Sequence, residues 1–252
     1  MDMAMRRMMF QLSRGVHFRA VCAGGWAVYQ WQKRHGFGSH YMPKDIDLFV
    51  EYTSPEGPRE LSLILDTYVN NLDKSLHIDT SAVPINTDVY GPLYVHENEP
   101  PESTDIRAYL WCVLSHLNRV SDKDVINHVA QLYAARDPLV VAPRPEIVKC
   151  LYFDINLSKM WLNVLVLRPR PKPRTALEFV ESFDLAHCAV IASVDAEDDM
   201  EWTFTCDDLT RTCLETQTLV VRLDKVVQTK SRFTRVADRM IKYVKRGFQL
   251  SS

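Results

Sequence analysis

The stretch that decides the fold is Val21-Cys-Ala-Gly-Gly-Trp-Ala-Val-Tyr-Gln30, followed after a loop by Pro43-Lys-Asp-Ile-Asp-Leu-Phe-Val50. Residues 18–23 are short, apolar and β-forming, which predicts a strand that ends at paired glycines. From Trp26 the apolar residues return to helical spacing. Residues 44–50 alternate between polar and apolar, which predicts a second strand with one acidic and one apolar face.

Asp45 and Asp47 stand two residues apart on this strand, so their side chains emerge on the same face. Two such carboxylates repel each other, and a divalent cation is the usual compensation. Mg²⁺ (or Mn²⁺) prefers oxygen ligands and is often held by one or two carboxylates together with substrate phosphates. Gly24 and Gly25 lack a Cβ, which lets backbone N–H groups approach a triphosphate at a helix start. Together these residues indicate a phosphoryl-transfer site, although either motif alone is also typical of a surface strand or a turn.

This arrangement resembles the signature of the nucleotidyltransferase (polymerase β-like) superfamily, in which Gly-Gly or Gly-Ser precedes a helix and an Asp-x-Asp strand follows. Residues 44–48 (KDIDL) are especially similar to CCA-adding enzymes and to the nucleotidyltransferases of bacterial abortive-infection and toxin systems. The resemblance implies that Asp45 and Asp47 bind metal and that Gly24 and Gly25 hold the triphosphate. The loop before Asp45 is longer than in the minimal family pattern. Its Ser39, and Lys44 beside the acids, are further candidates to bind the triphosphate.

The resemblance also implies a third carboxylate, from a neighbouring strand, that binds metal and acts as general base. The apolar strand at residues 162–167 contains no acid. The Phe-Asp pair that ends at Asp184 resembles a segment of nucleotidyltransferase-like proteins of large DNA viruses and some fungi, and so does KYVKRGF at residues 242–248. Asp184 is therefore the predicted third acid, with Asp154 as the alternative. A capping role for Asp184 between a helix and a strand is the other interpretation.

Composition excludes several classes of protein. The 252 residues include 30 Lys plus Arg, 32 Asp plus Glu and 46% hydrophobic residues, which are globular values and exclude a disordered or fibrous chain. No apolar run approaches the roughly 18 residues that a membrane span needs. Six scattered cysteines without a C-x-x-C pair favour reduced thiols in a cytoplasmic protein. The sequence has no Gly-x-Ser-x-Gly elbow or Walker lysine loop, which argues against a hydrolase triad or a P-loop enzyme.

We expect one domain over residues 1–252, of α/β (α+β) class, with a nucleotidyltransferase-like mixed twisted sheet flanked by helices. A helical insertion is predicted near residues 105–136 and a basic C-terminal helix near residues 231–246. Apolar spacing predicts the remaining elements. These are helices at 3–14, 61–72, 105–118, 122–135 (capped by Ser121) and 175–181, and strands at 84–95, 147–155, 160–167 and 185–194, with a strand pair at 202–204 and 219–223.

The C-terminal part of the chain is basic. Residues 222–246 contain nine Lys or Arg and two Asp, and Arg235, Arg239, Lys242 and Arg246 recur at helical spacing. Such a stripe could meet nucleotide phosphates or an RNA backbone, so Arg239 and Lys242 are candidates for substrate binding. The alternative is a solvated helix face.

The predicted reaction is transfer of a nucleoside monophosphate from an NTP to an acceptor hydroxyl, with release of pyrophosphate. The acceptor is an RNA end, a protein or a small molecule. A second hypothesis keeps the fold without the chemistry, as an inactive scaffold that binds a protein or RNA. A third, a module that only binds RNA, rests on the C-terminal charge alone.

Overall fold

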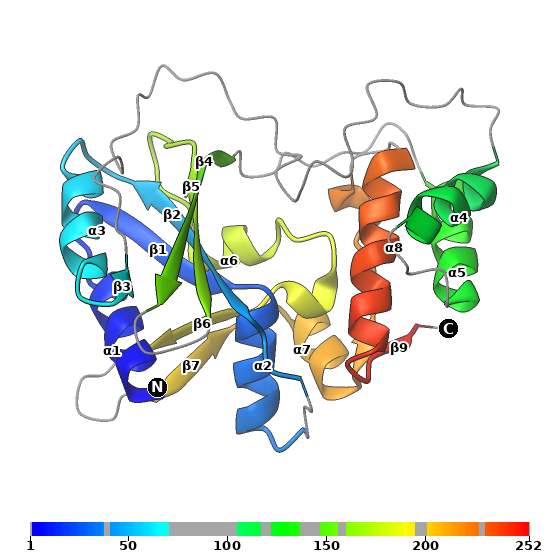
Figure 1. The fold of residues 1–252 in the computed structure, drawn as a ribbon, viewed down its shortest axis with the longest axis horizontal. Coiled ribbons are helices and arrows are strands. Elements are labelled where there is room, and N and C mark those ends of the chain that lie inside the picture. The colour runs from blue at the N-terminus through cyan, green and yellow to red at the C-terminus, as the bar shows by residue number, and fades with distance from the viewer. Residues whose placement is uncertain are drawn as a thin grey trace. The chain divides into compact units, whose positions relative to one another are not determined.

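The computed structural model describes residues 2–37, 41–70, 105–116, 122–136, 147–155, 160–194, 201–226 and 230–251 (Figure 1). The sequence analysis treats the chain as one domain, whereas its contacts gather into two compact units. Each unit is therefore described by itself. The first comprises Met1–Tyr90, Pro145–Glu181 and Cys188–Asp207, and the second comprises Gly91–Arg144, Ser182–His187 and Asp208–Ser252.

A seven-stranded sheet forms the centre of the first unit, with the strand order β3-β4-β5-β2-β1-β6-β7. The central strand β2 runs parallel to β5 and antiparallel to β1, and the remaining pairs are antiparallel. This mixed sheet with flanking helices confirms the predicted α+β class. The strands are β1 (Phe18–Ala23), β2 (Asp45–Tyr52), β3 (Val69–Asn70), β4 (Ile147–Ile155), β5 (Trp161–Leu167), β6 (Ile191–Val194) and β7 (Trp202–Thr205).

Three helices from the N-terminal part of the described chain pack against this sheet, in addition to the short helix α6 (Ala176–Val180), which contacts β7. α1 (Asp2–Ser13) lies against β1 and β6, α2 (Gly25–Arg34) against β1, β2 and β6, and α3 (Gly57–Leu65) against β1 and α1. The apolar side of β2, formed by Ile46, Leu48 and Val50, is at most 1% exposed. Asp45 and Asp47 alternate with these residues and are half-buried. The predicted two-faced strand is thus confirmed, and its apolar face is part of the core.

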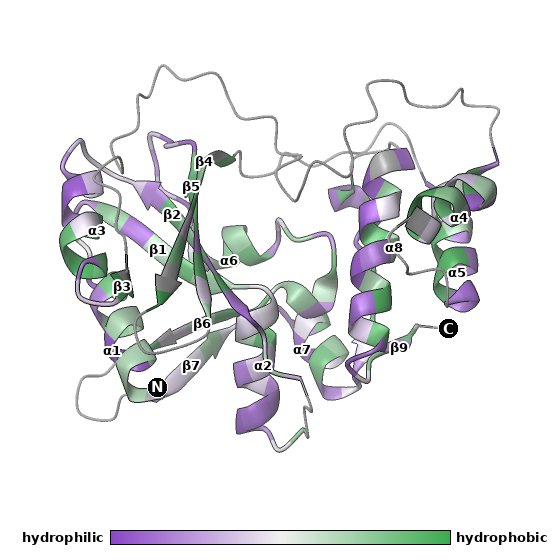
Figure 2. Ribbon diagram, viewed as in Figure 1, coloured by the Kyte–Doolittle hydropathy of each residue, from purple (hydrophilic) through white to green (hydrophobic). Residues whose placement is uncertain are grey.

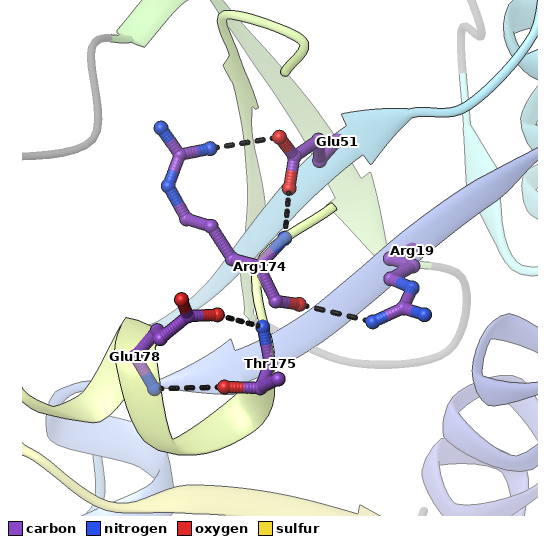
Figure 3. Close-up of polar contacts among 5 residues, drawn as sticks. All are labelled: Arg19, Glu51, Arg174, Thr175 and Glu178. Carbon is purple, nitrogen blue, oxygen red and sulfur yellow. Dashed lines mark hydrogen bonds and ion pairs between the residues drawn. The ribbon is translucent and has the colours of Figure 1, made fainter. Parts of the chain in front are cut away.

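The far end of β2 is joined to the linker after β5 by a buried ion pair (Figure 3). Arg174 Nη1 lies 2.9 Å from Glu51 Oε1, and both side chains are less than 8% exposed. The backbone N–H of Arg174 donates to the other carboxylate oxygen at 3.1 Å, and Arg19 on β1 donates to the Arg174 carbonyl at 3.0 Å. The next residues form a capping box between Thr175 and Glu178, which begins the short helix α6 (Ala176–Val180).

The second unit contains a group of helices. α4 (Ile106–His116), α5 (Lys123–Ala134) and α8 (Lys230–Val244) pack against one another, and the rings of Tyr133 and Phe233 meet edge to face at 5.0 Å. Hydrophilic and hydrophobic residues both occur along α8 (Figure 2). α7 (Asp208–Glu215) precedes β8 (Thr218–Leu219), which pairs in parallel with β9 (Gln249–Leu250) as a separate small sheet.

Several predicted elements differ from those observed. Asp122, rather than Ser121, caps α5 by accepting a hydrogen bond from the Val125 N–H; Ser121 lies outside the described residues. Part of the predicted strand at 185–194 is a 3₁₀ turn over Ala186–Cys188, so the strand begins only at Ile191.

The predicted strand at 202–204 is confirmed as β7, and the one at 219–223 is shortened to β8, but the two do not pair, because β7 pairs with β6 and β8 pairs with β9. The predicted helix at 61–72 instead begins at Gly57, with a proline in its first turn, and ends at Leu65. The predicted strand at 84–95 lies outside the described residues. In the parts of the chain that the structure describes, no helix has the length and apolar composition to cross a membrane.

Candidate functional site

The two acids of β2 meet a single amide on the neighbouring strand. In the register of β2 and β5, Asp45 lies beside Trp161 and Asp47 beside Asn163. Asn163 Nδ2 donates to Asp47 Oδ1 at 2.9 Å and lies 3.4 Å from Asp45 Oδ2. Asn163 is 8% exposed, so this amide is fixed in the sheet and holds both carboxylates on one face.

A glycine lies against the other oxygen of Asp47. Gly24 precedes α2 with φ 77° and ψ −147°, a conformation that essentially only glycine adopts. A Cβ at this position would lie 3.2 Å from Asp47 Oδ2. No side chain of residue 24 caps the helix, and the aligned peptide dipoles make a helix start electropositive. The structure therefore brings Asp45, Asp47, Gly24 and the start of α2 together, as the sequence analysis expects.

Groups near Asp47 respond to its charge. Burial, followed by the Asp47 carboxylate, raises the pKa of the Cys22 thiol, and the same two causes raise the pKa of Cys150 to about 11. Burial first, then Cys150 and Asp47, raises the pKa of the Tyr152 hydroxyl. These three groups are neutral at pH 7, so they add no negative charge to that of the acids.

The oxygen atoms of this site fit a cation that is bound by the two acids on one side and by a phosphate on the other. Asp45 and Asp47 supply carboxylate oxygens, which hard cations such as Mg²⁺ prefer. Asn163 presents its NH₂ group to the acids, and half a turn of the amide would present its oxygen instead. Among the described residues, no group of three or more His, Cys, Asp or Glu could enclose a metal ion.

The predicted third acid lies in the second unit. Asp184 accepts a hydrogen bond from Arg239 Nη1 at 2.6 Å, and the backbone N–H of Arg222 donates to its carbonyl at 2.7 Å. Since each unit is described by itself, the role of Asp184 at the acid pair stays a prediction. Asp154, the alternative, pairs with Trp161 through β4, and its side chain lies outside what the structure describes.

Two further predicted ligands of the triphosphate have known positions. Gly25 is the first residue of α2. Lys44 is exposed at the start of β2, where its carbonyl accepts a hydrogen bond from the Trp161 N–H at 2.9 Å. Ser39 lies outside the described residues.

The predicted basic stripe on α8 is not a uniform solvent-facing surface. Arg235 is 8% exposed, Arg239 pairs with Asp184, and the Arg246 guanidinium lies 4.7 Å from the centre of the Tyr243 ring. Lys242 remains exposed. The partner of Arg239 lies in the segment Ser182–His187 and that of Arg246 on α8 itself, so both basic residues have partners within the second unit.

Sequence analysis missed Asn163. The resemblance predicts an acid from a neighbouring strand, and β5 contains none. Its signal is nevertheless visible, because Asn163 is the single strongly polar residue within Trp161–Leu167 (WLNVLVL). A buried strand rarely contains an amide unless that amide has a hydrogen-bonding partner.

Comparison with known proteins gives limited similarity. No protein-family model and no curated protein matches the chain. Among solved structures, two apo forms named tRNA-processing enzyme have TM-scores of 0.43 and 0.41, at 15% and 14% identity. They cover 98% and 96% of this chain, and a tRNA-processing enzyme complex has a TM-score of 0.41 with 96% covered. The chain spans 43–44% of the length of these structures. Similarity at this level carries no functional conclusion.

Proposed function

We propose that the acid pair Asp45–Asp47 binds a nucleoside triphosphate as its Mg²⁺ complex, and that the chain transfers the nucleoside monophosphate to an acceptor hydroxyl. The observation that carries this proposal is the position of Asp47 Oδ2, 3.2 Å from where a Cβ of Gly24 would stand, at the start of α2. Carboxylates suit a cation and a helix start suits a phosphate, so their proximity supports the proposal.

Different residues of the chain would bind the cation and the phosphates. Asp45 and Asp47 would hold the cation. When bound, the cation would neutralise the negative charge of the phosphates. The first N–H groups of α2, from Gly25 onward, would donate to phosphate oxygens. Lys44 and Ser39 are further proposed ligands of the triphosphate, and Arg239 and Lys242 stay predicted ligands in the second unit.

The proposed reaction forms a bond between the acceptor oxygen and the α-phosphorus and breaks the bond from that phosphorus to the oxygen it shares with the β-phosphate. Pyrophosphate leaves, and the acceptor proton passes to a base. Asp184 stays our predicted base, with Asp154 as the alternative. The acceptor is an RNA end, a protein hydroxyl or a small molecule, and the resemblance to the nucleotidyltransferase superfamily supports this class of reaction.

Thermal melting with ATP and Mg²⁺ tests the binding step, and incorporation of labelled NTP tests the transfer. We expect ligand at a hundred times its Kd to stabilise the protein by about 2.7 kcal/mol. Asp45→Asn/Asp47→Asn should lose both signals. Asp66→Asn, at an exposed acid on the C-terminal cap of α3, is the matched control and should keep both. Incorporation that persists in the double variant would exclude the proposed site.

A second candidate is a scaffold that binds nucleotide without transferring it. Asn163 favours this candidate, because the group that accompanies the two acids is a neutral amide, which neither adds negative charge nor accepts a proton at neutral pH. Stabilisation by ATP and Mg²⁺ without incorporation into any of the three acceptor classes would identify the scaffold.

A further inference from the structure

Two large aromatic side chains remain exposed next to the acid pair. Tyr152 on β4 is 58% exposed and Trp161 on β5 is 49% exposed, whereas the neighbouring Phe153 and Leu162 are at most 4% exposed. We propose that Tyr152 and Trp161 form an aromatic platform that stacks a nucleobase whose phosphate is bound at Asp45 and Asp47. This inference rests on the proposed function and names the class of ligand that the site takes.

Strand register puts both rings on the acid side of the sheet. Trp161 lies beside Asp45 in the β2–β5 pairing, and Tyr152 lies beside Asn163 in the β4–β5 pairing. Residues paired across neighbouring strands project to the same face. The hydrogen bonds of Asn163 to Asp45 and Asp47 identify that face as the one that carries the carboxylates.

The spacing of the strands suits one nucleotide. Neighbouring strands lie about 4.8 Å apart, so Trp161 is one strand from Asp45, and Tyr152 is two strands, about 10 Å, from Asp47. A phosphate at the acids and its base on the aromatic rings would therefore span adjacent positions on one continuous surface.

The chemistry of the surface favours a nucleobase over an apolar partner. An apolar protein segment laid on the two rings would also cover two carboxylates and leave them without a counter-charge. A nucleotide suits both the rings and the carboxylates. Its base has a π-face that stacks on aromatic rings, and its phosphates can be bound to the acids through a cation. The base belongs either to the bound NTP or to a single-stranded RNA acceptor, whose unstacked bases offer the same face.

Three probes separate stacking from phosphate binding. They are ATP with Mg²⁺, tripolyphosphate with Mg²⁺, which has no base, and a short single-stranded oligoadenylate with Mg²⁺. We expect Trp161→Ala and Tyr152→Ala to weaken binding of ATP or of the oligonucleotide about tenfold each and to leave tripolyphosphate binding unchanged. Trp161→Phe and Tyr152→Phe should retain most of the affinity. Leu63→Ala, at a 68% exposed position on α3, is the control and should change nothing.

Each outcome decides the inference. Loss confined to the ATP arm assigns the platform to the NTP base, and loss confined to the oligonucleotide arm assigns it to RNA. The inference is overturned if the Ala variants lose equal affinity for ATP and tripolyphosphate, or if they lose none. It is also overturned if the wild-type protein binds neither ATP nor the oligonucleotide. Self-association that requires Trp161, without an effect on nucleotide, would identify a protein interface instead. If oligonucleotide binding requires Trp161 while Asp45→Asn/Asp47→Asn has no effect on ATP, the platform stands and the proposed function fails.

Discussion

Asn163 contacts both acids of the site, and its replacement by Asp is the simplest test of what its amide does. Asn163→Asp removes the donor that holds the carboxylates together and adds a third negative charge. Without metal, repulsion should lower the melting temperature. With Mn²⁺, the variant should bind the cation about tenfold more tightly, because a third carboxylate is a better ligand than a neutral amide oxygen. Melting in EDTA and calorimetric titration with Mn²⁺ measure the two effects.

The control for this prediction is Asn127→Asp, which adds the same charge at an exposed position on α5. It should change neither the melting temperature nor Mn²⁺ binding by much. An Asn163→Asp protein that melts like wild type in EDTA would show that the amide does not hold the acid pair.

Gly24 tests the contact with Asp47 directly. Gly24→Ala places a Cβ 3.2 Å from Asp47 Oδ2 on a backbone with φ 77°, whereas Gly36→Ala has a similar φ of 75° and open space around its Cβ. Both should lose about 1–3 kcal/mol of folding stability through backbone strain, measured by urea unfolding. Only Gly24→Ala should also weaken the binding of ATP with Mg²⁺. Equal ligand affinity in the two variants would contradict a site at this helix start.

At the scale of elements, the ion pair between Glu51 and Arg174 anchors the strand that carries the acids (Figure 3). Glu51→Ala leaves the Arg174 guanidinium buried without its partner and should cost about 3–5 kcal/mol in urea unfolding. Glu201→Ala is the control, because its pair with Arg34 is about half exposed on both sides and should be worth less than about 1 kcal/mol. Similar losses in the two variants would mean that burial of the first pair has no energetic consequence.

The strands that sequence predicts well are those whose own pattern decides their structure. β1 and β2 follow from an apolar run and from strict alternation, and Gly24-Gly25 marks the start of α2. β6 and β7 are harder to predict, because their pairing depends on contacts with distant segments. The same reason explains the missed Asn163 amide, since its role appears only once β5 lies beside β2.

At the scale of the whole molecule, contacts between segments far apart in the sequence determine which partners the predicted residues have. Asp184 is predicted from its neighbours in sequence alone, whereas its pairing with Arg239, 55 residues further on, appears only in the folded chain and leaves its predicted role untested. The division into two units has the same origin, because residues 182–187 leave the first unit to pack with the C-terminal segment. Composition alone does not reveal such long-range pairing.

The stability of the second unit should depend on pH through His187. Burial first, then Arg239 and Arg246, lowers the pKa of His187 to about 3, while Asp184 acts in the opposite direction. Since the unfolded value is near 6.5, the unfolded chain binds the extra proton between these pH values. This contribution to stability is therefore complete above about pH 6.5 and is lost as the pH falls toward 3, by up to about 1.4 kcal/mol per pH unit.

His187→Phe isolates this effect. The ring would keep its packing against Tyr243 and Phe248, whose centres lie 4.2 Å and 4.9 Å from that of His187. Urea unfolding between pH 4 and 7 should show a shallower pH dependence in the variant than in the wild type. An unchanged dependence would assign the acid sensitivity to the carboxylates instead.

The amide of Asn163 also bears on how the protein would behave between encounters with a ligand. Because a neutral donor already contacts both carboxylates, their adjacency does not require a bound ion. Under the proposed function, chelator-treated protein should stay folded and should take up a cation together with the nucleotide rather than from free metal in solution.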